Sequence, residues 1–480
     1  MILTSLPFID TPVPGIEFDS VVSDSRQARP GCLFAAVRGS HDDGGIYAAA
    51  AVRAGATAIL CDANSRENME RLRVPVVTAP DVRLAMAHLA SLVSGNPSAS
   101  MDVFAVTGTN GKTSVAWMLA EMLRADGRKP GLQTTVAVEY AQTSLPSART
   151  TPGSCEFQQL LSVMLAAGCD SVVTEASSHA LDQQRLAAVR LAGGIFTNLT
   201  EDHLDYHKTM AAYFTAKKKL FAQLAKTTPG APAVICVSAP GGEEMAEYAK
   251  TLPLRVLRVG IGDAPDHFLQ ARGLQMDNGN CSFRLCCGAQ QAEITTALSG
   301  RYNVANLICA GAMAIAAGVE FNAVAEVMRR VRPRWGRLER VSCALPFSVY
   351  VDYAHTDDAL RNVLSALREI CRGKLIVVFG CGGDRDRGKR PLMGRACAEG
   401  ADCMVVTSDN PRSEDPMSII GEILSGVPPT AKCIVEPDRR AAIVRAIQSA
   451  GAGDAVLGLN PVTDSVERLG QILHLFADVK

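Results

Sequence analysis

TGTNGKT, at residues 107–113, is the stretch that decides how the rest of the chain is interpreted. It follows a short apolar run, 103–106, which predicts a buried strand, and it precedes 114–123, which predicts a helix. A strand, a glycine turn and a Lys-Thr pair at a helix start direct backbone N–H groups, the helix N-terminus and the Lys112 ammonium at one anion. The stretch therefore predicts a loop that holds polyphosphate, with the hydroxyl of Thr113 on a magnesium ion.

The spacing of the glycines differs from that of a standard phosphate-binding loop. Counting back from Gly111, Val106 occupies the position of the first glycine, and Gly108 lies closer to the lysine. The alternative interpretation is an ordinary glycine turn between a strand and a helix, without a ligand. The strand, the turn and the helix taken together favour the phosphate loop.

Composition limits the class of protein. The chain has 480 residues, which predicts about three domains. Its net charge of −1 comes from 48 basic and 49 acidic residues, a balance that argues against broad binding to nucleic acids or membrane surfaces. The 15 cysteines lack the spacing of a disulfide framework, which predicts reduced thiols in a cytoplasmic protein. The first ten residues do not resemble a signal peptide, and the longest apolar run, 308–319, is shorter than the ~20 residues of a membrane helix.

Strand and helix patterns alternate along most of the chain and are interrupted at two places. Residues 94–98 are rich in turn formers, and 332–334 contain a proline. These breaks predict an N-terminal domain over 1–99, a central domain over 100–331 and a C-terminal domain over 332–480. The alternation predicts an α/β fold made of parallel βαβ units. The expected strands are 32–37, 58–61, 74–77, 103–106, 171–174, 194–197, 233–237, 348–352, 374–379, 403–407, 433–436 and 455–459, and a helix is expected over 46–53.

Two polar groups follow predicted strands of the central domain. Glu175 ends the apolar strand that starts at Ser171, and ligands of α/β sheets bind beyond the carboxyl ends of strands. We expect Glu175 to be a second magnesium ligand beside the phosphate loop; the alternative is a helix cap or a surface acid. Asp202, His203 and His207 cluster after the strand at 194–197, but a zinc site there lacks a third ligand with characteristic spacing.

Two loops of the C-terminal domain are rich in charge. GCGGDRDRGKR at 380–390 follows a strand, and its composition predicts anion binding, with disorder as the alternative. DNPR at 409–412 also follows a strand, and an arginine held in a proline-containing turn suits the bidentate binding of a carboxylate. The alternative is an ordinary Asn-Pro turn with an exposed arginine.

These motifs together resemble the Mur ligase family, and within it the MurE type. The resemblance extends over nearly the whole chain to about residue 457, and the motifs occur in family order. They are DSR (24–26), TGTNGKTS (107–114), TTP (150–152), EASSHALDQQRL (175–186), FTNLTEDHLDYHKTMAAYFTAKKKLF (196–221), GRYNVANL (300–307), GRLERV (336–341), VDYAH (351–355), GCGGDRDRGKRP (380–391) and TSDNPRSEDP (407–416).

The resemblance implies a three-domain architecture and a reaction. The N-terminal domain would bind a UDP-linked substrate, the central P-loop domain ATP, and a Rossmann-like C-terminal domain the incoming amino acid. The reaction would be ATP-driven amide formation through an acyl phosphate, in which meso-diaminopimelate is added to UDP-MurNAc-L-Ala-D-Glu during peptidoglycan synthesis. The implied enzyme is a cytoplasmic ligase, expected to be a monomer, that uses ATP and two Mg²⁺ ions.

The resemblance also implies roles for individual residues. It assigns Lys112 to the phosphates, Thr113 and Glu175 to one magnesium ion, and His203 with a carbamylated Lys217 to a second. Lys217 is chosen because the family lysine follows Tyr-x-x-Ala, which matches the sequence that starts at Tyr213.

Three further groups of residues are implied to bind substrates. The nucleotide contacts are Gly108, Thr109, Asn110, Gly111, Ser114, Asn303, Arg337 and Asp352. The contacts to the UDP-linked peptide are Ser25, Thr150, Thr151, Ser177, Arg185 and His207. The contacts to the amino-acid acceptor are Arg390, Asp409, Asn410 and Arg412.

Two departures from the family pattern leave alternatives open. Asp357 stands where the family usually has the proline of His-Thr-Pro, a mild change. More importantly, 460–465 read NPVTDS where the family has a Gly-Lys-Gly-His-Glu loop, whose glutamate would bind the distal ammonium of the acceptor. One alternative is therefore a paralogue that joins another amine in a specialised pathway. Another is a nucleotide-binding regulatory protein with weak catalysis, against which the intact Lys112, Glu175 and His203 argue.

Overall fold

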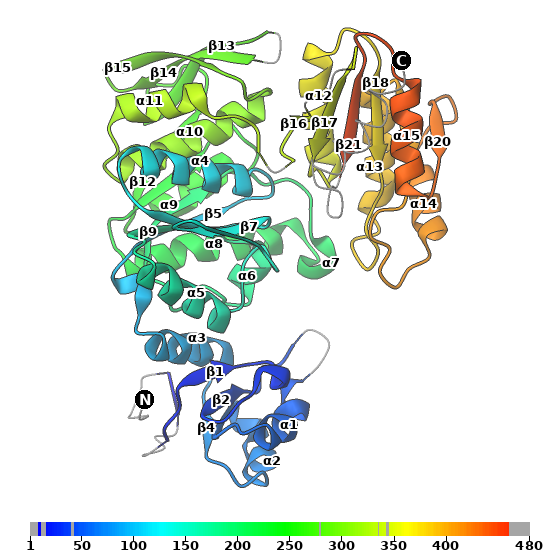
Figure 1. Ribbon diagram of the computed structural model, residues 1–480. Coiled ribbons are helices and arrows are strands. Elements are labelled where there is room, and N and C mark those ends of the chain that lie inside the picture. Colours follow the sequence, from blue (N-terminus) through cyan, green and yellow to red (C-terminus); the bar gives the residue numbers. More distant parts are fainter. Residues whose placement is uncertain are drawn as a thin grey trace.

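The computed structural model describes residues 8–10, 16–39, 43–277, 280–334, 336–341 and 345–459. The described chain forms three sheets, each with its own helices, and Figure 1 shows them in sequence order from blue to red. No helix among the described residues is long and apolar enough to cross a membrane. The predicted α/β class with parallel sheets is confirmed.

The N-terminal sheet has four parallel strands in the order β1-β2-β3-β4. Its strands are almost entirely buried because they are covered on both faces. The elements are β1 (Ser20–Val22), η1 (Ser25–Gln27), β2 (Cys32–Ala35), η2 (Gly44–Tyr47), α1 (Ala48–Arg53), β3 (Ala58–Cys61), η3 (Ala63–Ser65), α2 (Arg66–Glu70), β4 (Val76–Thr78) and α3 (Val82–Val93). Helix α3, capped by Asp81, leads through η4 (Pro97–Ala99) to the central sheet (Figure 1).

The central sheet has eleven strands in the order β15-β14-β13-β12-β11-β10-β5-β9-β6-β7-β8. All neighbours from β6 to β13 pair in parallel, and an antiparallel extension lies at each edge. The strands are β5 (Asp102–Thr107), β6 (Pro130–Gln133), β7 (Ala137–Tyr140), β8 (Thr143–Pro146), β9 (Ser171–Glu175), β10 (Leu191–Phe196), β11 (Pro232–Cys236), β12 (Arg255–Ile261), β13 (Leu269–Asp277), β14 (Asn280–Cys287) and β15 (Gln290–Thr296).

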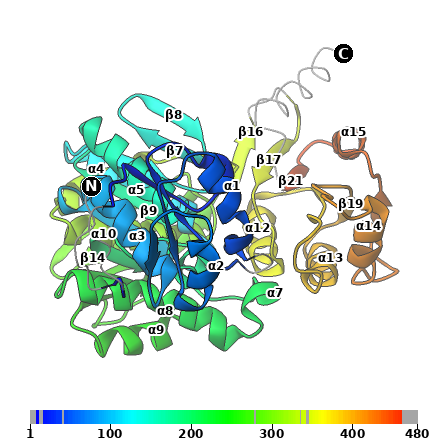
Figure 2. The ribbon, with the colours of Figure 1, turned by 90° about the horizontal axis from the view of Figure 1, so that it is seen from below.

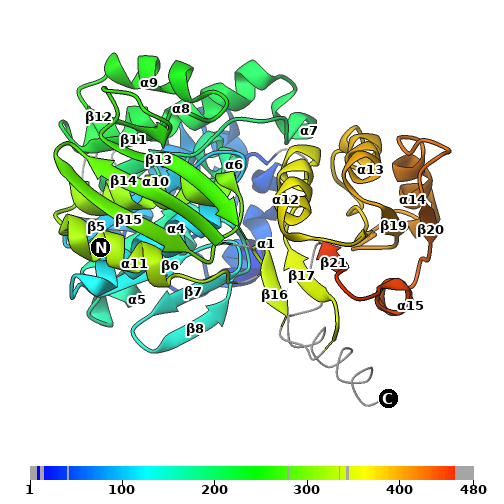
Figure 3. The same cartoon turned by 90° about the horizontal axis from the view of Figure 1, so that it is seen from above.

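Helices cover both faces of the central sheet. One hydrophobic core lies under α4 (Lys112–Ala125), α10 (Arg301–Ala316) and α11 (Phe321–Arg330). The other lies under α5 (Ser154–Ala166), α6 (Ser178–Asp182), α8 (Met210–Thr227) and α9 (Gly242–Lys250), and the short α7 (Leu204–His207) precedes α8. Figure 2 and Figure 3 show these two layers from opposite ends of the molecule.

The C-terminal sheet has the order β16-β17-β21-β18-β19-β20, in which only β16 is antiparallel to its neighbour. The elements are β16 (Glu339–Val341), β17 (Ser348–Asp352), α12 (Asp357–Ile370), β18 (Leu375–Phe379), α13 (Lys389–Gly400), β19 (Cys403–Val406), α14 (Pro416–Leu424), β20 (Cys433–Val435), α15 (Arg439–Ser449) and β21 (Ala455–Leu459). Helix α12 is on the side that faces the central sheet (Figures 1 and 3).

The expected strands agree with the observed ones to within a few residues, but nine strands among the described residues were not expected: β1, β6, β7, β8, β12, β13, β14, β15 and β16. The antiparallel strands β13–β15 and the hairpin β7–β8 extend the central sheet at its two edges. The three sheets occupy 20–78, 102–296 and 339–459, and the domain boundaries after 99 and 331 stay predictions. The departure at 460–465 lies outside the described residues.

Candidate functional site

The loop between β5 and α4 has a backbone that only glycine can supply at two positions. Gly108 and Gly111 have φ angles of +145° and +85°. A Cβ at Gly108 would lie 1.9 Å from the Thr197 hydroxyl, and one at Gly111 would lie 2.3 Å from the Asn306 amide oxygen. The predicted phosphate loop is therefore a tight turn in close contact with β10 and α10, and its shape is fixed before any ligand arrives.

Side chains from the next strand hold the loop. The backbone N–H of Asn110 donates to the Asn198 amide oxygen at 2.9 Å, and the N–H of Thr109 donates to the Asn198 carbonyl at 3.0 Å. The ammonium of Lys112 donates to the carbonyls of Gly108 and Thr109, at 3.1 and 2.7 Å. Burial lowers the pKa of Lys112, although Glu175 opposes this. The lysine thus lies folded over the loop, where an arriving phosphate would meet its charge.

Glu175 and Thr113 meet at the carboxyl ends of β9 and β5. The Thr113 hydroxyl donates to the buried Glu175 carboxylate at 2.7 Å. Glu175 also accepts from the N–H and the hydroxyl of Thr135, at 2.7 and 3.0 Å. Arg337 donates to the Thr113 hydroxyl at 3.0 Å. Hydroxyl and carboxylate oxygens are the ligands that Mg²⁺ prefers, so this pair fits the ion expected beside the phosphate loop.

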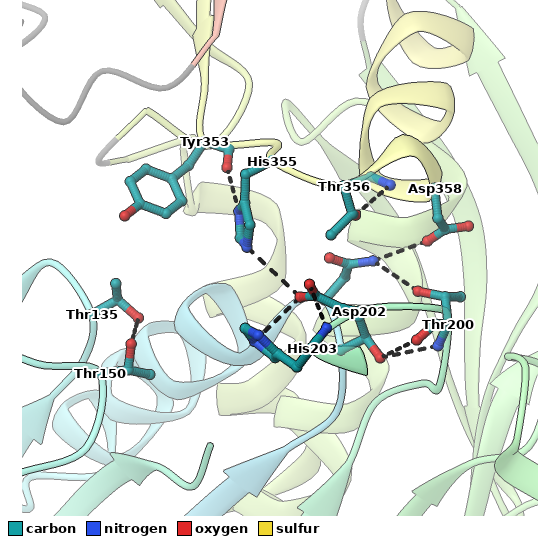
Figure 4. Close-up of polar contacts among 12 residues, drawn as sticks. Thr135, Thr150, Thr200, Asp202, His203, Tyr353, His355, Thr356 and Asp358 are labelled. Carbon is teal, nitrogen blue, oxygen red and sulfur yellow. Dashed lines mark hydrogen bonds and ion pairs between the residues drawn. The ribbon is translucent and has the colours of Figure 1, made fainter. Parts of the chain in front are cut away.

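Asp202 joins the central and C-terminal units at the cavity (Figure 4). Its buried carboxylate lies 3.3 Å from the Nε2 atom of His203 and 3.9 Å from the Nε2 atom of His355. Burial lowers the pKa of His203 to about 3 and that of His355 to about 4. Both imidazoles are therefore neutral at pH 7, the form in which histidine binds a metal.

Lys217 differs sharply from the two lysines that follow it. Its ammonium is buried, donates to the Gly108 carbonyl at 2.7 Å and lies 4.1 Å from the centre of the Tyr213 ring. Burial, and then the charge of Lys112, lower its pKa well below the usual value. Lys218 and Lys219 instead form ion pairs with carboxylates of α9 and α6. Among the described residues no group of three His, Cys, Asp or Glu side chains could hold a metal, so the zinc alternative still lacks its third ligand.

A second group of predicted residues lies beside Glu175. Thr151 donates to the Glu175 carbonyl at 2.7 Å and accepts from the N–H of Ser177 at 3.1 Å. Arg185 donates to the Thr151 carbonyl at 2.8 Å, and Thr150 accepts from the Thr135 hydroxyl at 3.1 Å (Figure 4). These contacts hold the TTP segment and α6 together at one wall of the cavity.

The predicted nucleotide contacts come together at the junction of the central and C-terminal units. Asp352, at the end of β17, accepts from the N–H groups of Leu338 and Ala354, at 2.6 and 2.8 Å, and burial raises its pKa to about 6. The guanidinium of Arg337 lies 4.6 Å from the centre of the Tyr353 ring. The junction therefore presents one buried carboxylate and one arginine to the cavity.

One cavity of about 740 Å³ unites most of these residues, and the central and C-terminal units both line it. Of the predicted residues it contains Thr109, Asn110, Gly111, Lys112, Thr113, Ser114, Thr150, Thr151, Glu175, Ser177, Arg185, His203, Asn303, Arg337, Asp352, Asp409, Asn410 and Arg412. Gly108, Lys217 and His207 lie behind this wall, and Ser25 belongs to η1 of the N-terminal unit. The Nε2 atom of buried His207 has no partner within the described chain.

Arg390 does not line the cavity, and its predicted contact with the acceptor stays a prediction. Its side chain is 0% exposed and makes ion pairs with Glu414 at 2.7 Å and Glu422 at 2.8 Å. It also donates to the Gly382 carbonyl at 3.2 Å. Arg390 therefore holds the 380–388 loop against α14, and the exposed Arg385 of that loop lines the cavity instead.

The DNPR turn at 409–412, called the acceptor turn from here on, has an arginine with a strained backbone conformation. Arg412 has a φ of +49°, is exposed, and donates to the Gly383 carbonyl. Arg439 lies 3.8 Å from the partly buried Asp409 carboxylate. A strained backbone conformation persists where contacts with the surroundings hold it. Here the hydrogen bond to the Gly383 carbonyl of the neighbouring loop is such a contact.

Several cavity residues received no role from the sequence. Asp202 and His355 belong to sequence motifs of the family and follow strands. Their position beyond the ends of strands could therefore have indicated a role in the site. Asp358, in the first turn of α12, does not line the cavity but accepts from the Asn110 amide of its wall at 2.9 Å, a contact across 248 positions that no sequence pattern indicates. Asp357 takes the first position of α12 after the Thr356 cap, where proline is also well tolerated. Others are Thr135, Arg149, His179, Asn306, Arg385 and Lys389.

Comparison with known proteins gives one consistent family. The profile described as Mur ligase family, catalytic domain, matches residues 17–93. The Mur ligase middle domain matches 106–314, and the profile described as Mur ligase, glutamate ligase domain, matches 336–459. The three matches follow the order of the three sheets.

Individual relatives match nearly the whole chain. It is 40% identical over 443 residues to a protein of Syntrophomonas wolfei named UDP-N-acetylmuramoyl-L-alanyl-D-glutamate--2,6-diaminopimelate ligase, covering 92% of this chain and 89% of the relative. The protein of the same name from Gloeobacter violaceus is 40% identical over 447 residues, covering 93% and 89%. A solved structure with that name has a TM-score of 0.67 at 31% identity and covers 94% of this chain and 91% of its own.

Proposed function

Because the chain belongs to the Mur ligase family, we propose that it is an ATP-dependent ligase that adds meso-diaminopimelate to UDP-MurNAc-L-Ala-D-Glu in peptidoglycan precursor synthesis. The names of its relatives support this substrate pair. The observation that carries the proposal is the single cavity lined by the phosphate loop, by Arg185 and by the DNPR turn. ATP, the UDP-linked substrate and the amino-acid acceptor must meet in such a reaction. The phosphate loop, the wall with Arg185 and the DNPR turn would each bind one of them.

The reaction has two steps. A carboxylate oxygen of the UDP-linked substrate attacks the γ-phosphorus of ATP, and the bond from that phosphorus to ADP breaks. The amine of the acceptor then attacks the acyl carbon, phosphate leaves with the electron pair of the C–O bond, and the nitrogen loses a proton. The first step brings two anions together, and the second develops negative charge on the tetrahedral intermediate and on the leaving phosphate. Positioning and fixed positive charges therefore supply most of the rate enhancement.

The residues of the phosphate side bind and orient the triphosphate. Lys112 offsets the charge on the phosphoryl group, and the N-terminus of α4, where the glycine turn ends, adds positive potential. Thr113 and Glu175 would hold a magnesium ion, which would neutralise phosphate charge. His203 and a carbamylated Lys217 would hold a second ion. The buried position of Lys217 supports carbamylation, because only a neutral amine reacts with CO₂.

The other two walls bind the molecules that are joined. Thr150, Thr151, Ser177, Arg185 and His207 would contact the peptide end of the UDP-linked substrate, and Ser25 its nucleotide end in the N-terminal unit. Asn303, Arg337 and Asp352 would contact ATP. Asp409, Asn410 and Arg412 would bind the acceptor, now together with Arg385 in place of Arg390. We also propose that the protein acts in the cytoplasm, in keeping with its many cysteines without disulfide-framework spacing. We propose that it acts as a monomer.

ADP release tests the proposed function. The purified chain is incubated with ATP, Mg²⁺, UDP-MurNAc-L-Ala-D-Glu and meso-diaminopimelate, and each component is omitted in turn. We expect ADP release that depends on every component and a product that contains both organic substrates. ADP release that does not depend on the UDP-linked substrate would exclude this reaction. Binding of ATP without any turnover would support the alternative of a regulatory protein.

A further inference from the structure

Lys389 is a cation of the cavity that has no protein partner. It is the first residue of α13 and lines the cavity with Thr113 and His203. Within the described chain its ammonium makes no hydrogen bond or ion pair. The next residue, Arg390, is fully buried and is neutralised by two glutamates. The two adjacent cations thus have different environments. Arg390 stabilises the fold through its ion pairs, whereas Lys389 is available to bind a ligand in the cavity.

The charge of Lys389 acts on groups of both units that line the cavity. Lys389 lines the same cavity as the buried carboxylate of Asp202, which comes from the central unit. On the acceptor turn, burial raises the pKa of Asp409, and Lys389 is one of the charges that oppose the rise. Lys389 thus lines the cavity together with His203 of the central unit and Arg412 of the acceptor turn.

This position suits an anion that is present only during the reaction. Lys112 approaches the phosphates from the central unit, whereas Lys389 comes from the unit that carries the acceptor turn. The N-terminus of α13, whose Gly388 cap provides no side-chain hydrogen bond, adds positive potential at the same place. Fixed positive charge facing a developing negative charge is an efficient form of transition-state stabilisation.

We propose that the Lys389 ammonium contacts the phosphoryl group while it passes to the substrate carboxylate and again while it leaves as phosphate. The role is electrostatic: Lys389 stays protonated, donates hydrogen bonds to phosphoryl oxygens and forms no covalent bond. This inference rests on the proposed function. It gives the C-terminal unit a catalytic residue as well as the acceptor contacts, so that both steps need the two units together.

Steady-state kinetics of Lys389→Met tests the role. The matched control is Arg395→Met, which removes one positive charge from an exposed position on the same helix. We expect Lys389→Met to lower kcat by ~10²-fold, with the KM of the acceptor changed less than about 3-fold, because one charge that stabilises the transition state is lost. Lys389→Arg should recover part of kcat, and the control should match the wild type.

A second measurement separates phosphoryl binding from structure. Wild type and Lys389→Met are titrated with ADP and Mg²⁺, with and without aluminium fluoride and UDP-MurNAc-L-Ala-D-Glu. We expect the wild type and the variant to bind ADP alone with equal affinity. Aluminium fluoride should increase the affinity of the wild type for ADP but not that of the variant. If Lys389→Met melts early, Lys389→Gln is measured in its place, because the half-exposed position accepts a shorter polar side chain.

Three outcomes would overturn the inference, and they differ. A kcat within 2-fold of wild type would remove Lys389 from the reaction. A raised acceptor KM with unchanged kcat would make it a contact of the acceptor carboxylate instead. Absence of ADP release by the wild type would refute the proposed function, and the role of Lys389 with it.

Discussion

The phosphate side and the acceptor side of the cavity are built in opposite ways. On the phosphate side, Thr113 and Glu175 are buried and bonded to each other, and glycines without room for a side chain shape the loop. On the acceptor side, Arg385 and Arg412 are exposed, and the buried Arg390 holds the loop that carries Arg385 from behind. We therefore expect phosphoryl transfer to depend on a rigid structure, and the choice of amine to depend on exposed side chains that can change at little cost to the fold.

Lys112→Ala is the largest test of the rigid side. We expect turnover to fall on the order of 10³-fold or more, because the charge that faces the phosphoryl group is lost. The melting temperature should stay near that of the wild type. The control is Lys219→Ala, which removes an exposed lysine paired with Asp182. Near-normal ADP release by Lys112→Ala would remove the phosphate-loop assignment.

Lys217→Ala tests whether the buried lysine is carbamylated. We expect a loss of activity of about 10²-fold, with partial recovery when a small carboxylate such as acetate is added, because a carboxylate oxygen can replace the carbamate as a magnesium ligand. Lys218→Ala, which removes the neighbour paired with Glu244, should remain active. A well-ordered crystal of the nucleotide complex that ends Lys217 at a plain ammonium would refute carbamylation.

Arg390→Met tests the support behind the acceptor side. Glu414 would lose its partner and Glu422 would keep only Arg387, so we expect unfolding to become easier, because the cation that neutralises both carboxylates is removed. Chemical denaturation of the wild type and the variant measures the change. Arg387→Met, which removes an exposed partner of Glu422, should cost far less. Equal losses in the two variants would mean that burial of Arg390 is unimportant.

Arg412→Lys tests the exposed side directly. We expect the KM of the acceptor to rise roughly 10-fold, because lysine cannot reproduce the bidentate contact of a guanidinium with a carboxylate, and one charge-assisted contact is worth ~1.5–3 kcal/mol. The KM of ATP should not change. An unchanged acceptor KM would show that the carboxylate is bound elsewhere, and Arg385→Lys would then be the variant to measure.

Sequence patterns predicted the rigid side better than the exposed side, for a physical reason. Buried parallel strands and glycine turns allow few residue types, so β5, β9 and the phosphate loop could be located closely. Charged loops allow many residue types, and the GGDRDRGKR segment gave no indication which cation faces the cavity. Arg390, chosen from the sequence, does not line the cavity, and Lys389 and Arg385, which do, received no role. Contacts between distant segments, such as Asn110 with Asp358, and the antiparallel edge strands depend on packing that no local pattern reveals.

The central claim is that the exposed side of this cavity selects an amine that carries a second carboxylate. The measurement is kcat/KM for meso-diaminopimelate and for L-lysine, which has the same reacting group but lacks the distal carboxylate, with UDP-MurNAc-L-Ala-D-Glu and ATP held saturating. The account predicts at least a 10-fold preference for meso-diaminopimelate, the value of one charge-assisted contact of about 1.5 kcal/mol or more. Equal or better use of L-lysine, or of other amines without that carboxylate, would contradict the role of Arg412 and favour a paralogue with a different acceptor.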